Sequence, residues 1–279
     1  MTVAVIGTGL IGGSMALALK DLGIASKVIG VDASKSHLNE AKQLKLIDES
    51  GTLSYAIKKA DLIIVAIPVD AATKVLPRIL DRVTTQVVMD VGSTKRQINE
   101  AIAGHPNRSR FVASHPMWGT EYSGPKAAQR EAFKGKVTVI SDRDKSDEDA
   151  LKLVENIYKA FEMKILYMDS VEHDLHTAYI SHISHITSFA LANTVLEKEK
   201  EKNTIFDLAS AGFESTVRLA KSNPTMWLQI FIQNRDNILD VLKEHISQLK
   251  KFESSIKKGD EKELKQLIDN ANKIRKILK

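Results

Sequence analysis

A glycine-rich turn near the N-terminus constrains the fold more than any other feature of this sequence. Gly7, Gly9 and Gly12 form the pattern G-x-G-x-x-G, directly after the apolar run 3–6 and before a segment rich in Met, Leu and Ala. A second apolar run ends at Asp32, twenty residues beyond Gly12. Glycine permits the tight turn, the close approach of a pyrophosphate and the close packing of helix on strand. This order of elements predicts a dinucleotide-binding βαβ unit.

The residue at the end of the second apolar run indicates which dinucleotide binds. A carboxylate at Asp32 can accept hydrogen bonds from both ribose hydroxyls and would repel a 2′-phosphate, so we expect NAD. Lys35 keeps NADP open as an alternative, because it could reach a 2′-phosphate if Asp32 turned away. The expected cofactor-binding residues lie in the glycine turn and after the strands: Gly7, Gly9, Leu10, Ile11, Gly12, Asp32, Ala66, Pro68 and Ser93.

Strand-like and helix-like segments alternate as far as residue 169. The candidate strands are 3–6, 28–31, 62–66, 87–90, 110–113, 137–141 and 164–168, and the candidate helices between them are 11–22, 36–44, 71–83 and 147–161. This alternation is typical of a parallel sheet, and fully apolar strands suit a sheet covered on both faces. We therefore expect an α/β fold in which residues 1–169 form a Rossmann-type dinucleotide-binding domain with a mostly parallel sheet.

The remainder, residues 170–279, is expected to form an all-helical domain. We expect Ser170 to cap a helix that runs to about residue 198, and Asn223 followed by Pro224 to start another. From Trp227 to Phe252, apolar residues recur at steps of three and four over about seven turns. Such a long stripe favours packing against a second copy of the chain, with a long intrachain helix as the alternative.

Composition excludes several classes of site and partner. The 279 residues include no cysteine, which rules out disulfides, thiol nucleophiles and cysteine-ligated zinc. The formal net charge is +5, and the whole surplus lies in 250–279, where basic and acidic residues are interspersed at helical spacing. This spacing indicates a solvated helix face rather than a nucleic-acid site. With no basic leader and no apolar run long enough to cross a membrane, we expect a soluble, cytoplasmic protein.

His115 is the main candidate for a catalytic group. It follows the candidate strand 110–113, so the carboxyl edge of the sheet would carry it to the cofactor crevice. An imidazole exchanges protons near neutral pH, which a dehydrogenase requires when it oxidises an alcohol. Ser93 follows the strand 87–90 and is expected at the same edge.

Five segments carry most of the chemically informative residues. They read GTGLIGGS at 7–14, DVGSTK at 90–95, HPMWGTE at 115–121, SHISH at 181–185, and GFESTVR with NPTMW at 212–227. In this order they resemble the prephenate and arogenate dehydrogenases of tyrosine biosynthesis over essentially the whole chain. That family has a dinucleotide-binding domain and a helical domain that forms a homodimer. It oxidatively decarboxylates prephenate to 4-hydroxyphenylpyruvate, passing hydride to a nicotinamide.

The resemblance implies roles for individual residues. His115 would accept the proton of the ring hydroxyl, and Ser93 would orient that hydroxyl and the imidazole. Arg218 would hold a substrate carboxylate, which a guanidinium can bind through two parallel hydrogen bonds. Aromatisation supplies the driving force, so no metal is expected. The expected substrate-binding residues come from the helical domain and the segment after His115: His182, His185, Arg218, Thr120 and Glu121.

Two residues depart from the family pattern. Trp118 stands where members more often have a small residue, so we expect a differently shaped pocket rim. Ser184 stands where many members have proline, so we expect a straighter helix there.

Simpler structural interpretations compete with some of these roles. The H-x-x-H spacing could hold a metal, but no carboxylate stands at matching spacing, and we expect His173 and His176 to be surface or interface residues. Arg218 could instead pair with Glu214 four residues earlier on a helix. Trp227 begins the apolar stripe and is expected in the core.

Three functional alternatives stay open at this point. One is arogenate as the preferred substrate, and another is a β-hydroxyacid dehydrogenase of similar layout, in which a lysine would replace the helical histidines. The third is a catalytically silent NAD-binding dimer that acts as a sensor. Direct inhibition by tyrosine at the active site also stays open.

Overall fold

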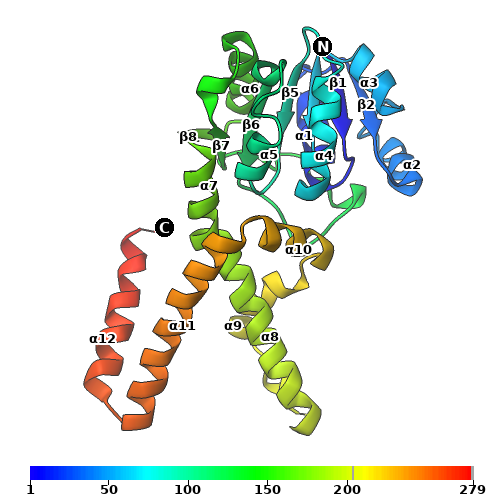
Figure 1. Ribbon diagram of the computed structural model, residues 1–279. Helices are drawn as coiled ribbons and strands as arrows, with labels where there is room; N and C mark the ends of the chain where they lie inside the picture. The colour runs from blue at the N-terminus through cyan, green and yellow to red at the C-terminus, as the bar shows by residue number, and fades with distance from the viewer. Residues whose placement is uncertain (203, 278–279) are drawn as a thin grey trace. The chain divides into compact units, whose positions relative to one another are not determined.

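The computed structural model describes residues 1–202 and 204–277, which form two compact units. The first ends at Asn234 and contains a mixed sheet and the helices α1 to α10, and the second begins at Arg235 and contains α11 and α12 (Figure 1). The residues that carry the predicted site all lie in the first unit.

The sheet has eight strands in the spatial order β3-β2-β1-β4-β5-β6-β7-β8. Neighbouring strands are parallel except for the antiparallel pair β6 and β7. This confirms the mostly parallel sheet, although the two-residue β3 is too short for a sequence pattern to predict. The strands are β1 Thr2–Ile6, β2 Lys27–Val31, β3 Glu49–Ser50, β4 Leu62–Val65, β5 Val87–Asp90, β6 Phe111–Pro116, β7 Val137–Ser141 and β8 Lys164–Met168.

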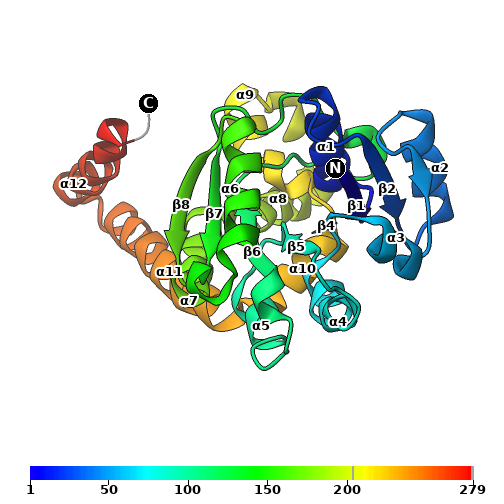
Figure 2. The same cartoon turned by 90° about the horizontal axis from the view of Figure 1, so that it is seen from above.

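Helices cover both faces of this sheet (Figure 2). Val3 and Val5 of β1 belong to one apolar cluster, whereas Ala4 and Ile6 belong to another, because successive side chains of a strand point to opposite faces. The first cluster includes α1 Leu10–Asp21, α2 Lys35–Gln43 and α6 Glu148–Ala160, and the second includes α3 Leu53–Lys59, α4 Val69–Leu80 and α5 Arg96–Glu100. Burial on both faces explains the uninterrupted apolar runs.

The helix predicted for 170–198 is confirmed, with a π-helical segment inside it. It comprises α7 Ser170–Thr177, a π-helical segment Ala178–His182 and α8 Ile183–Lys202. The prediction of Ser170 as cap is wrong by one residue, because the Asp169 carboxylate accepts the Glu172 amide hydrogen at 2.8 Å. Ser184 itself lies in the first turn of α8, directly after the wider π-helical segment, so the straighter helix expected at this residue stays a prediction.

The next helices, α9 Ala211–Val217 and α10 Pro224–Gln233, complete the first unit. Asn223 caps α10 through its side-chain oxygen, as predicted, and Trp227 is buried in the apolar cluster on the α3–α5 face. The single long stripe is wrong, since α10 ends at Gln233 and a new helix begins at Arg235. The Asn234 side chain bonds to groups on α7 and the π-helical segment instead of continuing the helical pattern.

The second unit is a pair of helices, α11 Arg235–Lys258 and α12 Glu261–Asn272. Gly259 adopts a positive φ of 64° between them, and the Asp260 carboxylate caps α12 at the Glu263 amide. Large apolar side chains stay exposed on this unit: Leu239, Ile246, Leu249, Ile256, Ile268, Ile274 and Ile277.

No helix within the described ranges combines the length and apolarity needed to cross a membrane.

Candidate active site

The glycine turn between β1 and α1 has no space for a side chain at Gly7 and Gly12, but it has space at Gly9. Gly7 has φ +97°, and a Cβ there would lie 2.3 Å from the Ala66 carbonyl oxygen. A Cβ on Gly12 would lie 2.0 Å from the Gly7 carbonyl oxygen, whereas one on Gly9 would meet nothing within 4 Å. Gly7 and Gly12 therefore shape the turn, and Gly9 leaves space for a pyrophosphate at the start of α1.

Asp32 is held at the end of β2 by its neighbours. One carboxylate oxygen accepts the Thr8 amide hydrogen at 2.9 Å and the Thr8 hydroxyl at 3.1 Å, and the other accepts the Ser34 amide hydrogen at 2.9 Å. This keeps a negative charge beside the glycine turn, where a ribose with a free 2′-hydroxyl fits better than a 2′-phosphate. The alternative cation, Lys35, is exposed at the start of α2.

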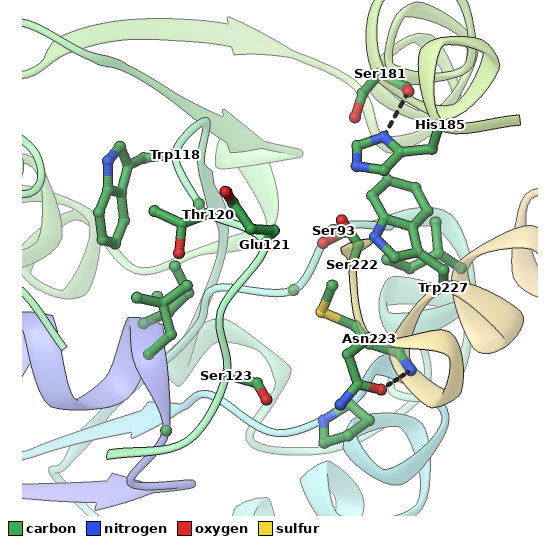
Figure 3. Close-up of a pocket in the computed structure, with 18 of the residues that line it drawn as sticks. Ser93, Trp118, Thr120, Glu121, Ser123, Ser181, His185, Ser222, Asn223 and Trp227 are labelled. Atoms are coloured by element: carbon green, nitrogen blue, oxygen red, sulfur yellow. Dashed lines mark hydrogen bonds between the residues drawn. The ribbon is translucent and has the colours of Figure 1, made fainter. Parts of the chain in front are cut away.

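One cavity of about 570 Å³ brings most of the predicted site residues together. The glycine turn and the ends of β4, β5 and β6 contribute from the sheet. The π-helical segment, α8, the connection between α9 and α10, and α10 contribute from the helical part (Figure 3). Gly7, Gly12 and Asp32 lie outside the cavity lining and support the turn beside it. The predicted residues that line it are Gly9, Leu10, Ile11, Ala66, Pro68, Ser93, His115, Thr120, Glu121, His182, His185 and Arg218.

His115 lies near the end of β6, where Val139 of β7 is its partner in the sheet. Its Nδ1 lies 2.9 Å from His173 Nε2, and His173 Nδ1 lies 2.8 Å from an Asp174 carboxylate oxygen. Burial lowers the pKa of His115 well below 6.5, and the neighbouring His173 and Lys95 lower it further. The ring is therefore neutral at pH 7 and can accept a proton.

His173 is completely buried, so the prediction of a surface or interface position for this residue is wrong. His176, in contrast, is half exposed on the same helix, as expected. The reason is the position of α7, which follows β8 and points its first turn at the carboxyl end of the sheet. There the Asp174 carboxylate accepts the amide hydrogens of Lys95 and Arg96 at 2.7 and 3.0 Å.

A buried ion pair fixes the loop that carries Ser93. Asp90 and Lys95 are both fully buried and form an ion pair with each other. Asp90 also accepts the amide hydrogens of Gly92 at 2.9 Å and Ser114 at 3.1 Å. Because Ser114 precedes His115, this pair joins the Ser93 loop to the strand of the histidine; breaking such a pair leaves an uncompensated buried charge. Ser93 lines the cavity.

The two histidines of the SHISH segment are held differently. His182 is buried, and its Nδ1 lies 3.1 Å from the Asn234 amide nitrogen, which donates to it. Burial lowers the pKa of His182 to about 4. His185 donates from Nδ1 to the Ser181 carbonyl oxygen at 3.0 Å and stacks on Trp227 with ring centroids 3.5 Å apart (Figure 3). Both imidazoles are therefore oriented before any ligand binds.

Arg218 reaches from the helical part to the loop after β6. Its guanidinium lies 3.2 Å from the Glu121 carboxylate, and its side chain is half exposed. The alternative pairing with Glu214 is wrong, because Glu214 is approached by Lys221 at 3.8 Å instead. This pairing positions a cation at the rim of the cavity, where it can meet an anionic ligand.

Trp118 lies in the rim of the cavity and packs into the apolar core. Its ring meets Phe133 edge to face, with centroids 5.6 Å apart, and Phe133 is buried in the apolar cluster that includes residues of α1 and α6. The bulky side chain therefore anchors the loop after β6 at the rim of the cavity.

Sequence reasoning missed His173, Asp174, Asn234 and the Asp90–Lys95 pair. The sequence did contain a signal for His173 and Asp174, because they are adjacent and lie in the first turn of the helix predicted directly after the last strand. Asn234 could be noticed only as a polar residue that interrupts an apolar stripe. Within the described ranges, no group of three or more His, Asp or Glu side chains is arranged to hold a metal ion.

Comparison with known proteins gives a consistent result. The family model for the nucleotide-binding domain of prephenate dehydrogenase matches residues 15–167, and that for its dimerization domain matches residues 169–270. A prephenate dehydrogenase of Bacillus subtilis is 32% identical, over 94% of this chain and 72% of that protein. The crystal structure of prephenate dehydrogenase from Aquifex aeolicus with hydroxyphenyl propionate and NAD+ is 26% identical, has a TM-score of 0.88, and is matched over 99% of this chain and 98% of that one. The structure of Synechocystis arogenate dehydrogenase, also 26% identical, has a TM-score of 0.75 with 99% of both chains covered.

Proposed function

The chain belongs to the prephenate dehydrogenase family, and we propose that it oxidises prephenate with NAD, releasing carbon dioxide and 4-hydroxyphenylpyruvate in tyrosine biosynthesis. One observation carries the proposal: His115, the glycine turn and Arg218 line the same cavity of about 570 Å³. NAD supplies the hydride acceptor when it is bound, and the glycine cradle and Asp32 fit it.

His115 is the proposed catalytic base. Because Nδ1 is occupied by His173, Nε2 is the nitrogen available to a ligand in the cavity. Taking the proton of the ring hydroxyl as hydride leaves avoids a positively charged carbonyl, so a neutral imidazole is the efficient group for this step. Ser93 is proposed to hold the hydroxyl on the cofactor side.

Arg218 is the proposed anchor for a substrate carboxylate. Its exposed guanidinium can exchange the single contact with Glu121 for a bidentate contact with substrate. His182, His185 and Thr120 are proposed to contact the rest of the substrate, and Glu121 to position Arg218. The stacking of His185 on Trp227 supports this role, because a preformed wall orients a ring at low entropic cost.

The proposal extends to the organisation of the protein. Residues 1–169 are proposed to bind the cofactor, and residues 170–279 to bind substrate and form a homodimer in the cytoplasm. The match to a dimerization domain and the exposed apolar side chains of α11 and α12 support the dimer.

Steady-state kinetics with prephenate and arogenate, each with NAD and NADP, test the proposal. We expect the highest kcat/KM for prephenate with NAD. Arogenate is the second candidate, favoured by the similarity to the Synechocystis enzyme. Failure of both ring substrates to reduce either cofactor would sink the proposal, and turnover of a β-hydroxyacid would favour the alternative family.

A further inference from the structure

The His173 ring is bonded at both nitrogens inside the protein. It has no exposed surface, and its bonds run to His115 Nδ1 at 2.9 Å and to an Asp174 carboxylate oxygen at 2.8 Å. The rings of His115 and His173 meet at 67°, with centroids 5.1 Å apart. His173 therefore connects the Asp174 carboxylate to the His115 imidazole through two hydrogen bonds.

The direction of each hydrogen bond follows from the carboxylate. A carboxylate only accepts, so His173 Nδ1 carries the proton in the bond to Asp174. In a neutral His173, Nε2 is then an acceptor, and the proton in the second bond belongs to His115 Nδ1. His115 is left with an unprotonated Nε2 towards the cavity.

Burial is the main reason that His173 is neutral. It lowers the pKa of His173 below 6.5, although the adjacent Asp174 carboxylate acts in the opposite direction. The ammonium of Lys95 also lowers this pKa. The His115 and His173 rings are therefore both uncharged at neutral pH, which agrees with the directions of their hydrogen bonds.

Asp174 is itself held from three sides. Its carboxylate accepts the amide hydrogens of Lys95 at 2.7 Å and Arg96 at 3.0 Å, and its carbonyl oxygen accepts from the Asn234 side chain at 2.6 Å. These bonds anchor the first turn of α7 to the loop that carries Ser93. The carboxylate can therefore neither rotate away nor be replaced by water without loss of several bonds.

His182 provides an internal contrast. Its Nδ1 accepts a hydrogen bond from the Asn234 amide, so the neutral ring carries its proton on Nε2. Of the three imidazoles that line the cavity, His115 thus carries an acceptor Nε2 and His182 a donor Nε2. Two buried side chains on the helical part, Asp174 and Asn234, determine this difference.

We propose that His173 and Asp174 are positioning residues that hold His115 in the tautomer protonated on Nδ1, so that Nε2 is always ready to accept the proton of the substrate hydroxyl. The inference rests on the proposed function for its catalytic consequence, but the tautomer is a property of the free protein. In the reaction, the hydroxyl proton moves to Nε2 and the Nδ1 proton stays in its bond to His173. No proton has to reach Asp174.

The first experiment reads the tautomer directly. In full-length protein with 15N-labelled histidine, two-bond 15N–1H correlation spectra at neutral pH distinguish Nδ1–H from Nε2–H for each ring, and His115→Asn assigns the signal. We expect His115 as Nδ1–H and His182 as Nε2–H in the absence of ligand. A His115 ring found as Nε2–H, or charged, would overturn the inference whatever the enzyme's substrate proves to be.

A matched pair of variants then tests the catalytic consequence. His173→Gln keeps an oxygen that can accept from His115, whereas His173→Met fills the space without an acceptor. We expect His173→Met to lower kcat by about 10²-fold with little change in KM, and His173→Gln to retain most of kcat. The same changes at the half-exposed His176 serve as controls and should leave kcat unchanged.

The outcomes separate the inference from the proposed function. If the wild type turns over neither ring substrate, the proposed function fails while the NMR result still decides the tautomer. If the Gln and Met variants lose activity equally while both remain folded by circular dichroism, His173 contributes packing alone and the inference is wrong. Loss of the Nδ1–H signal in the Met variant together with the fall in kcat would support it.

Discussion

The sheet and the segment α7–α10 of the first unit are stabilised in different ways. The strands are buried between two apolar clusters, in which residues such as Val5 and Ile6 need only the right size and face. The helical segment meets the carboxyl end of the sheet through buried polar groups, among them His173, Asp174 and His182. Each of these requires a specific partner, because an unpaired buried polar group is costly. The stability of the sheet, which carries the glycine turn, therefore depends on the shapes of apolar side chains. The arrangement of the helical segment, which carries the histidines, depends on the direction of its hydrogen bonds.

We expect the largest effect on activity from a substitution of His115, the proposed base. His115→Asn keeps a polar side chain but removes the base, and we expect kcat to fall by about 10³-fold. NAD affinity, measured by fluorescence titration, should not change. His176→Asn is the matched control and should behave as wild type. An active His115→Asn enzyme would contradict the proposed role of the imidazole.

Substitutions in the glycine turn test whether this part of the protein depends on close packing. Gly12→Ala forces a methyl group against the Gly7 carbonyl oxygen, 2.0 Å from the ideal Cβ position, and we expect a loss of about 1–3 kcal/mol in the free energy of unfolding. Gly9→Ala meets nothing within 4 Å, so it should leave the unfolding curve unchanged and weaken NAD binding. Urea denaturation and NAD titration measure the two effects. Equal destabilisation by both variants would mean that the turn is not shaped as described.

Arg218→Lys tests the anchor on the helical side. Lysine keeps the positive charge near Glu121 but cannot bind a carboxylate through two parallel bonds, so we expect KM for prephenate to rise by about tenfold. The kcat and the NAD affinity should change much less. An unchanged KM would assign the carboxylate to another group in the cavity.

We expect the smallest change in activity when the pH of the wild-type assay is varied. Neutral His115 is the active form and predominates above its pKa, which lies well below 6.5 because the ring is buried. We therefore expect kcat/KM to stay level as the pH falls from 8 through 6.5 and to decline only at lower pH. A decline centred near 6.5 would indicate a solvated base.

Periodicity and spacing predicted the sheet and the cofactor side well. Alternation along strands such as β1 and the spacing from Gly12 to Asp32 depend on local chemistry that a sequence displays. The cavity was predicted in its parts, since His115, Ser93 and Arg218 do line it together. The resemblance to a family contributed the roles of these residues.

Polar contacts between distant segments could not be predicted in the same way. His173 depends on α7 meeting the β5 loop, and the Arg218–Glu121 pair joins residues far apart in the chain. The break at Asn234 arises because its side chain has partners on another helix, which no apolar repeat encodes. Such contacts are fixed by tertiary structure rather than by local pattern.

In the proposed reaction, one cavity couples oxidation of prephenate to its decarboxylation. The direct test is to measure reduced NAD and released carbon dioxide in the same reaction of the full-length protein with prephenate. We expect one carbon dioxide for each reduced NAD, with both signals abolished together by His115→Asn. Reduced NAD without carbon dioxide would identify simple alcohol oxidation and contradict it.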